Sequence, residues 1–152
     1  MKVYYWSPFI SNVATTSAVI NSIKSIKKFS KNKINCKILN VFKEWDYFKK
    51  EIDSYNIDLI DLKTSIDIKN LPTKGFIKSR ITYLITYVLS IVKLHLLLKK
   101  NKPEFLIIHL ITSIPLSLLI LFNYETKFIL RVSGYPKLNF WRSILWKIAN
   151  KK

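Results

Sequence analysis

Short apolar runs rich in β-branched and aromatic residues recur along this chain, and segments with helical spacing separate them. Five runs are predicted to be strands: Lys2–Trp6, 36–42, 57–62, 104–110 and 127–133. Strands that alternate with helices indicate a parallel sheet, and nearly continuous apolar strands are typical of a sheet covered on both faces. We therefore expect an α/β fold, a Rossmann-like three-layer domain with a mainly parallel sheet that takes up residues 1–152.

The segments between the runs predict the helices. In the first segment, apolar residues recur at helical spacing as far as Phe29, with Ser11 or Asn12 as the N-cap. A long apolar helix is expected over 77–100, and a last helix over 138–150. Two shorter helices, a surface helix over 44–55 and a buried one after Pro115, complete the pattern. The acidic residues of the surface helix are expected to be solvated: Glu44, Asp46, Glu51 and Asp53.

Two segments are long and apolar enough to raise a transmembrane alternative. Residues 81–98 and 105–122 are each 18 residues long, close to the length that a bilayer requires. The first contains Lys93 and His95, and the second contains His109 and a proline. These residues favour a helix packed under the sheet, with part of its surface able to lie on a membrane, over two spanning helices.

The chain is strongly basic, and its charge comes almost entirely from lysine. The formal net charge is +17, and 23 of the 26 basic residues are lysines. Such a charge draws a protein to anionic membranes or polyanions, although an A+T-rich coding sequence would produce the same excess of lysine. Nucleic-acid readers rely on arginine, so a basic nucleic-acid-binding module is only an alternative. With Cys36 as the single cysteine and no secretory signal, a cytoplasmic protein is expected.

Ligands of an open parallel sheet bind at the carboxyl ends of the strands, which selects residues 7–16, 61–65, 109–113 and 133–137. The first of these loops contains no glycine, so it matches neither the G-x-G-x-x-G fingerprint nor the P-loop. A standard NAD enzyme or P-loop NTPase is thus disfavoured. The small residues before the first helix can still hold an anion at the helix N-terminus. No metal-binding set is visible.

Two residues at the strand ends are candidates for function. Gly134 lets the backbone turn sharply or approach a ligand closely where the sheet opens, although Ser-Gly-Tyr-Pro could also be a simple tight turn. His109 lies at the end of the fourth strand and is the candidate catalytic residue, with a buried, hydrogen-bonded histidine as the alternative. His95, in the long apolar helix, is expected to be a packing residue.

Three stretches carry a resemblance to a known family. They are MKVYYWSPFISNVATTSAVINSI, PEFLIIHLITSIPLSLLILF and ILRVSGYPKLNFWRSILWKIANKK. Together they resemble the N-terminal domain of family 4 glycosyltransferases of the GT-B fold. The K-P-D-I-I-H-x-H pattern that is common in that family is matched by Lys102, Pro103, Glu104 and His109.

The resemblance implies the N-terminal, acceptor-side half of a GT-B enzyme, a retaining and metal-independent hexosyltransferase. It also implies a cleft lined by residues from three loops: Ser11, Asn12, Val13, Ala14, Thr15, His109, Arg131, Ser133, Gly134 and Tyr135. The first five would face the donor phosphate and the sugar, and His109 with 133–135 would lie on the acceptor side. Members of the family commonly have Gly-Gly where this chain has Asn12-Val13-Ala14. The glutamate pair E-x7-E of the second domain does not occur here.

The function expected from these observations is sugar transfer from a nucleotide-sugar to a lipid-linked or polysaccharide acceptor in cell-surface glycan synthesis. The nucleotide-sugar is a co-substrate, and no cofactor is expected. The C-terminal donor-binding domain is absent from residues 1–152, so the chain is expected to be a fragment that is inactive alone. Its expected partners are the missing domain or a partner subunit and an anionic membrane surface, not nucleic acid, with a location on the inner face of the cell membrane. The alternative is a non-catalytic membrane-docking subunit of a split glycosyltransferase.

Overall fold

The computed structural model describes residues 1–8, 14–64, 66, 71–72, 75–132 and 139–151. Their five strands form one sheet in the order β3-β2-β1-β4-β5, and every neighbouring pair is parallel. The strands are β1 (Lys2–Trp6), β2 (Asn35–Asn40), β3 (Asp58–Asp61), β4 (Phe105–His109) and β5 (Lys127–Arg131). The α/β class and the Rossmann-like architecture predicted from the sequence are therefore confirmed.

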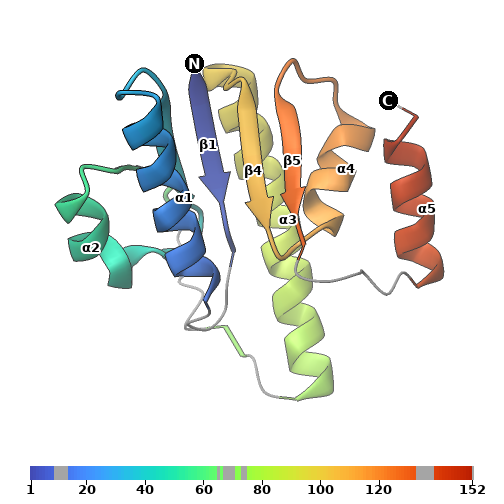
Figure 1. The fold of residues 1–152 in the computed structure, drawn as a ribbon. Helices are drawn as coiled ribbons and strands as arrows, with labels where there is room; N and C mark the ends of the chain where they lie inside the picture. The colour runs from blue at the N-terminus through green and yellow to red at the C-terminus, as the bar shows by residue number, and fades with distance from the viewer. Residues whose placement is uncertain (9–13, 65, 67–70, 73–74, 133–138, 152) are drawn as a thin grey trace.

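Helices cover both faces of the sheet (Figure 1). They are α1 (Thr15–Phe29), α2 (Lys49–Ser54), α3 (Phe76–Asn101), α4 (Ser113–Leu121) and α5 (Phe140–Ala149), with a 3-10 turn, η1 (Asp46–Phe48), before α2. Helices α1 and α2 cover one face, α3 and α4 cover the other, and α5 lies beside α4 (Figure 1). This arrangement is the three-layer domain that the alternation of strands and helices predicts.

Each face of the sheet carries its own hydrophobic core, because successive strand residues point to opposite faces. In β1, Val3 and Tyr5 pack toward α1 and α2, whereas Tyr4 and Trp6 pack toward α3 and α4. All four side chains are at most 3% exposed. Burial on both faces explains why the strands read as continuous apolar runs in the sequence.

The prediction of a surface helix over 44–55 is wrong at its start. Strand β2 ends at Asn40, and Val41 and Phe42 are fully buried. The Glu44 carboxylate accepts hydrogen bonds from the backbone N–H groups of both residues. Because it satisfies two buried donors, Glu44 is only 2% exposed and is not part of a solvated face. Helical structure begins two residues later, at Asp46.

Along the first two thirds of α3, the usual amphipathic arrangement is reversed. Its buried residues there are small and carry hydroxyl groups: Thr82, Thr86 and Ser90. Its exposed aliphatic residues form a row that we call the α3 stripe: Ile77, Ile81, Leu84, Val88, Val92 and Leu96. The N-terminal half of α3 extends beyond the carboxyl ends of the strands (Figure 1).

By length and composition, α3 could cross a membrane. Its most apolar 18-residue window has a mean hydropathy of 1.8, and 33% of that window is buried. A core helix of a water-soluble protein can have the same composition. The second segment of the transmembrane alternative, 105–122, contains strand β4 and the separate helix α4, so it is not one continuous helix.

Candidate functional site

The candidate site lies where the direction of the strand order changes, between β1 and β4. Chain connections leave these two neighbouring strands toward opposite sides, and ligands of doubly wound sheets bind in the resulting crevice. Helix α1 begins there, and strands β4 and β5 end there. A cavity of about 280 Å³ occupies this place, lined by Ala14, Thr15, Ala18, His109, Leu110, Arg131 and Val132.

The cavity brings together four of the predicted site residues. Ala14 and Thr15 come from the start of α1, His109 from the end of β4, and Arg131 from the end of β5. His109 and Arg131 are also paired in the register of the two strands. The other predicted site residues lie outside the described residues: Ser11, Asn12, Val13, Ser133, Gly134 and Tyr135.

His109 is the buried titratable group of this cavity. Its side chain is 3% exposed and lies against the Tyr5 ring, with 6.5 Å between the ring centroids. Burial and, to a smaller extent, the charge of Arg131 lower the pKa of His109 to about 4. The imidazole is therefore neutral at pH 7, with one nitrogen as a donor and the other as an acceptor.

A strained turn directly after His109 fixes the end of β4. The Ile111 N–H donates to the carbonyl oxygen of His109 at 2.9 Å, and Leu110 between them has a φ of 72°. A hydrogen bond that spans three residues around a positive φ defines the rare form of the γ-turn. The Leu110 N–H also donates to the carbonyl oxygen of Arg131 at 3.3 Å. Strained backbone of this kind is concentrated at functional sites.

The N-terminus of α1 gives one wall of the cavity a positive potential. Its N-cap residue, Ala14, supplies no side-chain hydrogen bond, and the first turn contains no acidic residue. Within the part of the chain that the structure describes, no side chain therefore supplies a capping acceptor to the first N–H groups of the helix. The helix dipole and the guanidinium of Arg131 both favour an anion in this place.

The sequence analysis missed Glu44 at the carboxyl end of β2. Burial raises the pKa of Glu44 to about 7, although the N–H groups of Val41 and Phe42 act in the opposite direction. A polar network surrounds it, in which the Asn40 side chain donates to Asp46 at 2.9 Å. Glu44 lies between two apolar residues, Phe42 and Trp45, which were a signal for burial. The charged neighbours of Glu44 concealed that signal.

The described residues contain no group of three or more His, Cys, Asp or Glu side chains that could hold a metal ion. The acidic residues are spread over separate elements.

Comparison with known proteins gives likenesses among solved structures and no relative in sequence. No family model matches the chain, and no curated protein matches it. Among solved structures, the chain is similar to a UDP-GlcNAc 2-epimerase from Neisseria meningitidis, bound to UDP-GlcNAc, with a TM-score of 0.48 and 16% identity. The match covers 79% of this chain but only 28% of the epimerase, so the chain spans less than a third of that protein's length.

Proposed function

We propose that this chain is the acceptor-side half of a GT-B-type glycosyltransferase that uses a nucleotide-sugar donor. One observation carries the proposal. One cavity at the crevice of a doubly wound sheet is lined by the N-terminus of α1, by Arg131 and by the buried, neutral His109. The helix N-terminus and the guanidinium suit the binding of a phosphate. The neutral imidazole supplies the hydrogen-bonding group that recognition of a sugar hydroxyl needs.

In this proposal the donor phosphate lies at the start of α1. Backbone N–H groups of Thr15 and its neighbours donate to the phosphate oxygens, and Arg131 adds a charge-assisted hydrogen bond. A neutral His109 accepts a hydrogen bond from a hydroxyl of the sugar or of the acceptor, a role that an imidazolium could not fill. No metal ion takes part, because the helix N-terminus and Arg131 balance the phosphate charge. Transfer occurs with retention, as the resemblance to family 4 glycosyltransferases implies.

The second wall of the cleft belongs to another folding unit in this proposal. The cavity of this chain holds about 280 Å³, just below the usual range for small-molecule sites. A donor-binding domain, either in a longer product of the same gene or in a partner subunit, completes the site. Residues 1–152 alone are then inactive, since one half of a cleft does not supply all the contacts that stabilise a transition state.

Titration of the chain with UDP- and GDP-sugars, followed by NMR of the backbone amides, tests phosphate binding at α1. We expect shifts centred on Thr15 and Thr16 and an affinity at least about tenfold weaker in Arg131→Gln, as for loss of a charge-assisted hydrogen bond. The matched control is Arg142→Gln, which removes the same charge from the exposed first turn of α5. Equal losses in both variants, or shifts centred elsewhere, would contradict the proposal.

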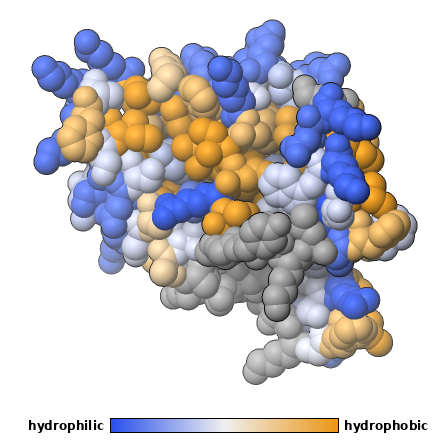
Figure 2. Space-filling model, turned by 45° about the vertical axis from the view of Figure 1, so that its right-hand side comes forward, coloured by the Kyte–Doolittle hydropathy of each residue, from blue (hydrophilic) through white to orange (hydrophobic). Residues whose placement is uncertain are grey.

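We further propose that the α3 stripe holds the protein on the inner surface of the cell membrane, peripherally rather than as a spanning helix. Leu84 and Val88 on this stripe are 60% and 50% exposed, while hydroxyl-bearing residues of the same helix are buried. Apolar and strongly hydrophilic side chains also lie next to one another on the face shown in Figure 2. Apolar side chains bordered by lysines suit the boundary between acyl chains and anionic headgroups.

The stripe lies at the end of the sheet where the cavity opens. The exposed N-terminal half of α3 extends beyond the carboxyl ends of the strands (Figure 1), and the cavity is formed by the carboxyl ends of β4 and β5. A membrane-bound α3 would bring that cavity close to a lipid-linked acceptor. Cell-surface glycan synthesis on a lipid carrier is the process that this geometry supports.

Flotation with vesicles tests the membrane proposal. We expect the chain to float with phosphatidylglycerol-containing vesicles, and Leu84→Asp to reduce the bound fraction at least about tenfold, because a charge would enter the apolar boundary. Phe29→Asp, at an 82% exposed position of α1, serves as the control and should bind as the unmodified chain does. Equal binding of Leu84→Asp and the unmodified chain would rule out the α3 stripe as the contact surface.

A further inference from the structure

A second cavity lies at the amino ends of the strands, at the opposite end of the sheet from the candidate site. Its volume is about 910 Å³, and it lies between the C-terminal half of α1, the first residues of β2 and β3, and the turn that precedes β3. Three lysines of α1 line it, and we call it the lysine cavity: Lys24, Lys27 and Lys28. None of the residues of the candidate site lines it.

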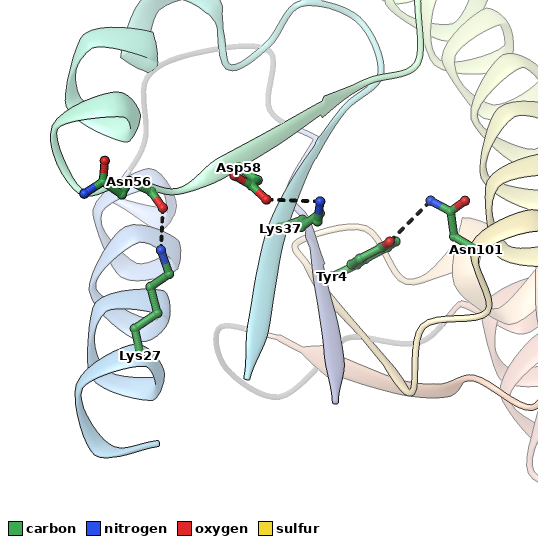
Figure 3. A network of polar contacts seen from close by, with 6 residues as sticks. All are labelled: Tyr4, Lys27, Lys37, Asn56, Asp58 and Asn101. Atoms are coloured by element: carbon green, nitrogen blue, oxygen red, sulfur yellow. Dashed lines mark hydrogen bonds and ion pairs between the residues drawn. The ribbon is translucent and has the colours of Figure 1, made fainter. Parts of the chain in front are cut away.

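Two of these lysines are held in defined positions. The ammonium nitrogen of Lys24 lies 3.8 Å from the centroid of the Tyr55 ring. The ammonium of Lys27 donates to the backbone carbonyl oxygen of Asn56, in the turn before β3 (Figure 3). Because an ammonium has three N–H donors, Lys27 keeps donors for a ligand after this contact. Both side chains are half-buried, and this fixed placement reduces the conformational entropy that ligand binding would cost.

The positive charge of the lysine cavity is not balanced by the described residues around it. Its acidic lining residue, Asp58, forms an ion pair with Lys37 at 3.0 Å, so its carboxylate is already neutralised (Figure 3). No ion pair between a described carboxylate and Lys24, Lys27 or Lys28 occurs in this part of the chain. Lys27 and Lys28 follow Lys24 by three and four residues, a spacing at which like charges on a helix repel one another. A bound anion would relieve that repulsion.

We propose that the lysine cavity binds a ligand that carries several phosphate groups. Three ammonium groups match a multiply charged anion, and lysine binds phosphate as a point charge without strict geometry. The side-chain amides of Asn21, Asn32 and Asn35 also line the cavity and can donate to phosphate oxygens or ligand hydroxyls. The volume is at the upper end of the range for small-molecule sites, which leaves room for a polar group beyond the phosphates.

Calorimetric titration of the chain with tripolyphosphate tests the site. We expect saturable binding that Lys28→Glu weakens at least about tenfold, because an exposed ammonium without a described partner is replaced by a repelling carboxylate. Lys147→Glu, on the exposed side of α5, changes the net charge equally and should alter the affinity less than about twofold. Lys24→Gln/Lys27→Gln provides a second variant inside the cavity, and its thermal unfolding shows whether the fold is kept.

Equal losses of affinity in Lys28→Glu and Lys147→Glu would overturn the proposal, because net charge alone would then explain binding. The absence of saturable binding would overturn it as well. A second arm identifies the source of the phosphates with vesicles of phosphatidylcholine containing phosphatidylinositol 4-phosphate. If Lys28→Glu abolishes vesicle binding, the phosphates belong to a lipid headgroup. If Lys28→Glu leaves vesicle binding unaffected, the ligand is a soluble phosphate compound. In the Arg131→Gln background, Lys28→Glu should weaken tripolyphosphate binding by the same factor as in the unmodified chain, so failure at the candidate site and failure here are separate results.

Discussion

Leu110 has a backbone conformation that residues other than glycine rarely adopt, and it follows His109 directly. Its φ of 72° lies in the left-handed region, where a Cβ atom meets the neighbouring carbonyl oxygen. Hydrogen bonds on both sides of the residue, to His109 and Arg131, hold it there. The fold therefore maintains a strained residue at the point where two predicted site residues enter the same cavity.

Replacement of Leu110 by glycine and by alanine tests this conformation. Both substitutions remove the same half-exposed side chain, but only alanine keeps the Cβ atom, so the glycine variant should be the more stable by about 1 kcal/mol. Urea denaturation measures the difference. At Ser25, an exposed position of helix α1, the same two substitutions should give the opposite order. An alanine variant at 110 that equals or exceeds the glycine variant would show that the left-handed turn is not present.

Single residues were the part of the molecule that the sequence predicted least well. The end-of-strand rule selected His109, which lies at the carboxyl edge because parallel strands end together, whereas Arg131 was named only through the family resemblance. Leucine has no preference for positive φ, so nothing in the sequence marked the turn at Leu110. Glu44 was predicted to be solvated because it is charged, and its burial depends on backbone donors that only the folded chain brings within reach.

At the scale of the elements, the C-terminus of α3 uses a lysine where glycine is the usual residue. Lys102 has φ 42° and ψ 60°, and its N–H donates to the carbonyl oxygen of Leu98. A left-handed residue that closes a helix in this way is usually glycine, which adopts this conformation without steric cost. The Lys102–Glu125 ion pair, at 3.6 Å between exposed side chains, contributes little that would compensate.

Lys102→Gly should therefore stabilise the protein by about 1 kcal/mol. The matched control is Lys100→Gly, two residues earlier and within the α-helical part of α3, which should destabilise the protein by about the same amount. Thermal and urea unfolding of both variants provide the comparison. Stabilities that change in the same direction in the two variants would show that Lys102 does not end the helix in the left-handed conformation.

Elements were predicted more accurately than residues because their signal is distributed over many positions. All five strands and the long helix occur where apolar periodicity placed them, and β1 has the predicted bounds. Strands β2 and β5 end earlier than the apolar runs do. At β2 the reason is that Val41 and Phe42 are buried although the chain has already left the sheet. A hydrophobic run does not distinguish buried residues of a strand from buried residues that follow it.

For the whole molecule, two buried titratable groups should affect stability in opposite directions as pH changes. The pKa of His109 is lowered from 6.5 to about 4, so stability is lost as pH falls from 6.5, because the unfolded chain then binds a proton that the folded chain does not. The pKa of Glu44 is raised from 4.5 to about 7, so stability is lost as pH rises from 4.5. At about 1.4 kcal/mol per pH unit, each effect amounts to about 3 kcal/mol, and the two oppose each other between pH 4.5 and 6.5.

Single variants separate the two effects. His109→Asn should unfold more easily as pH rises from 4.5 to 6.5, since only the contribution of Glu44 remains. Glu44→Gln should instead become more stable over the same range. Chemical denaturation at a series of pH values measures both slopes, and parallel profiles in the two variants would contradict the burial of one of the two groups.

The position of β4 in the sheet also sets an order for the synthesis of this protein. Strand β1 pairs on one side with β2 and on the other with β4, so Val3 lies beside both Cys36 and Phe105. On the ribosome, β1, β2 and β3 can pair early, but one edge of β1 stays open until β4 has been made. Helix α3 precedes β4 in the chain. The nascent chain therefore exposes its longest helix, with the apolar α3 stripe, before the second half of its sheet exists, and that interval is when chaperones or a membrane surface have most access to it.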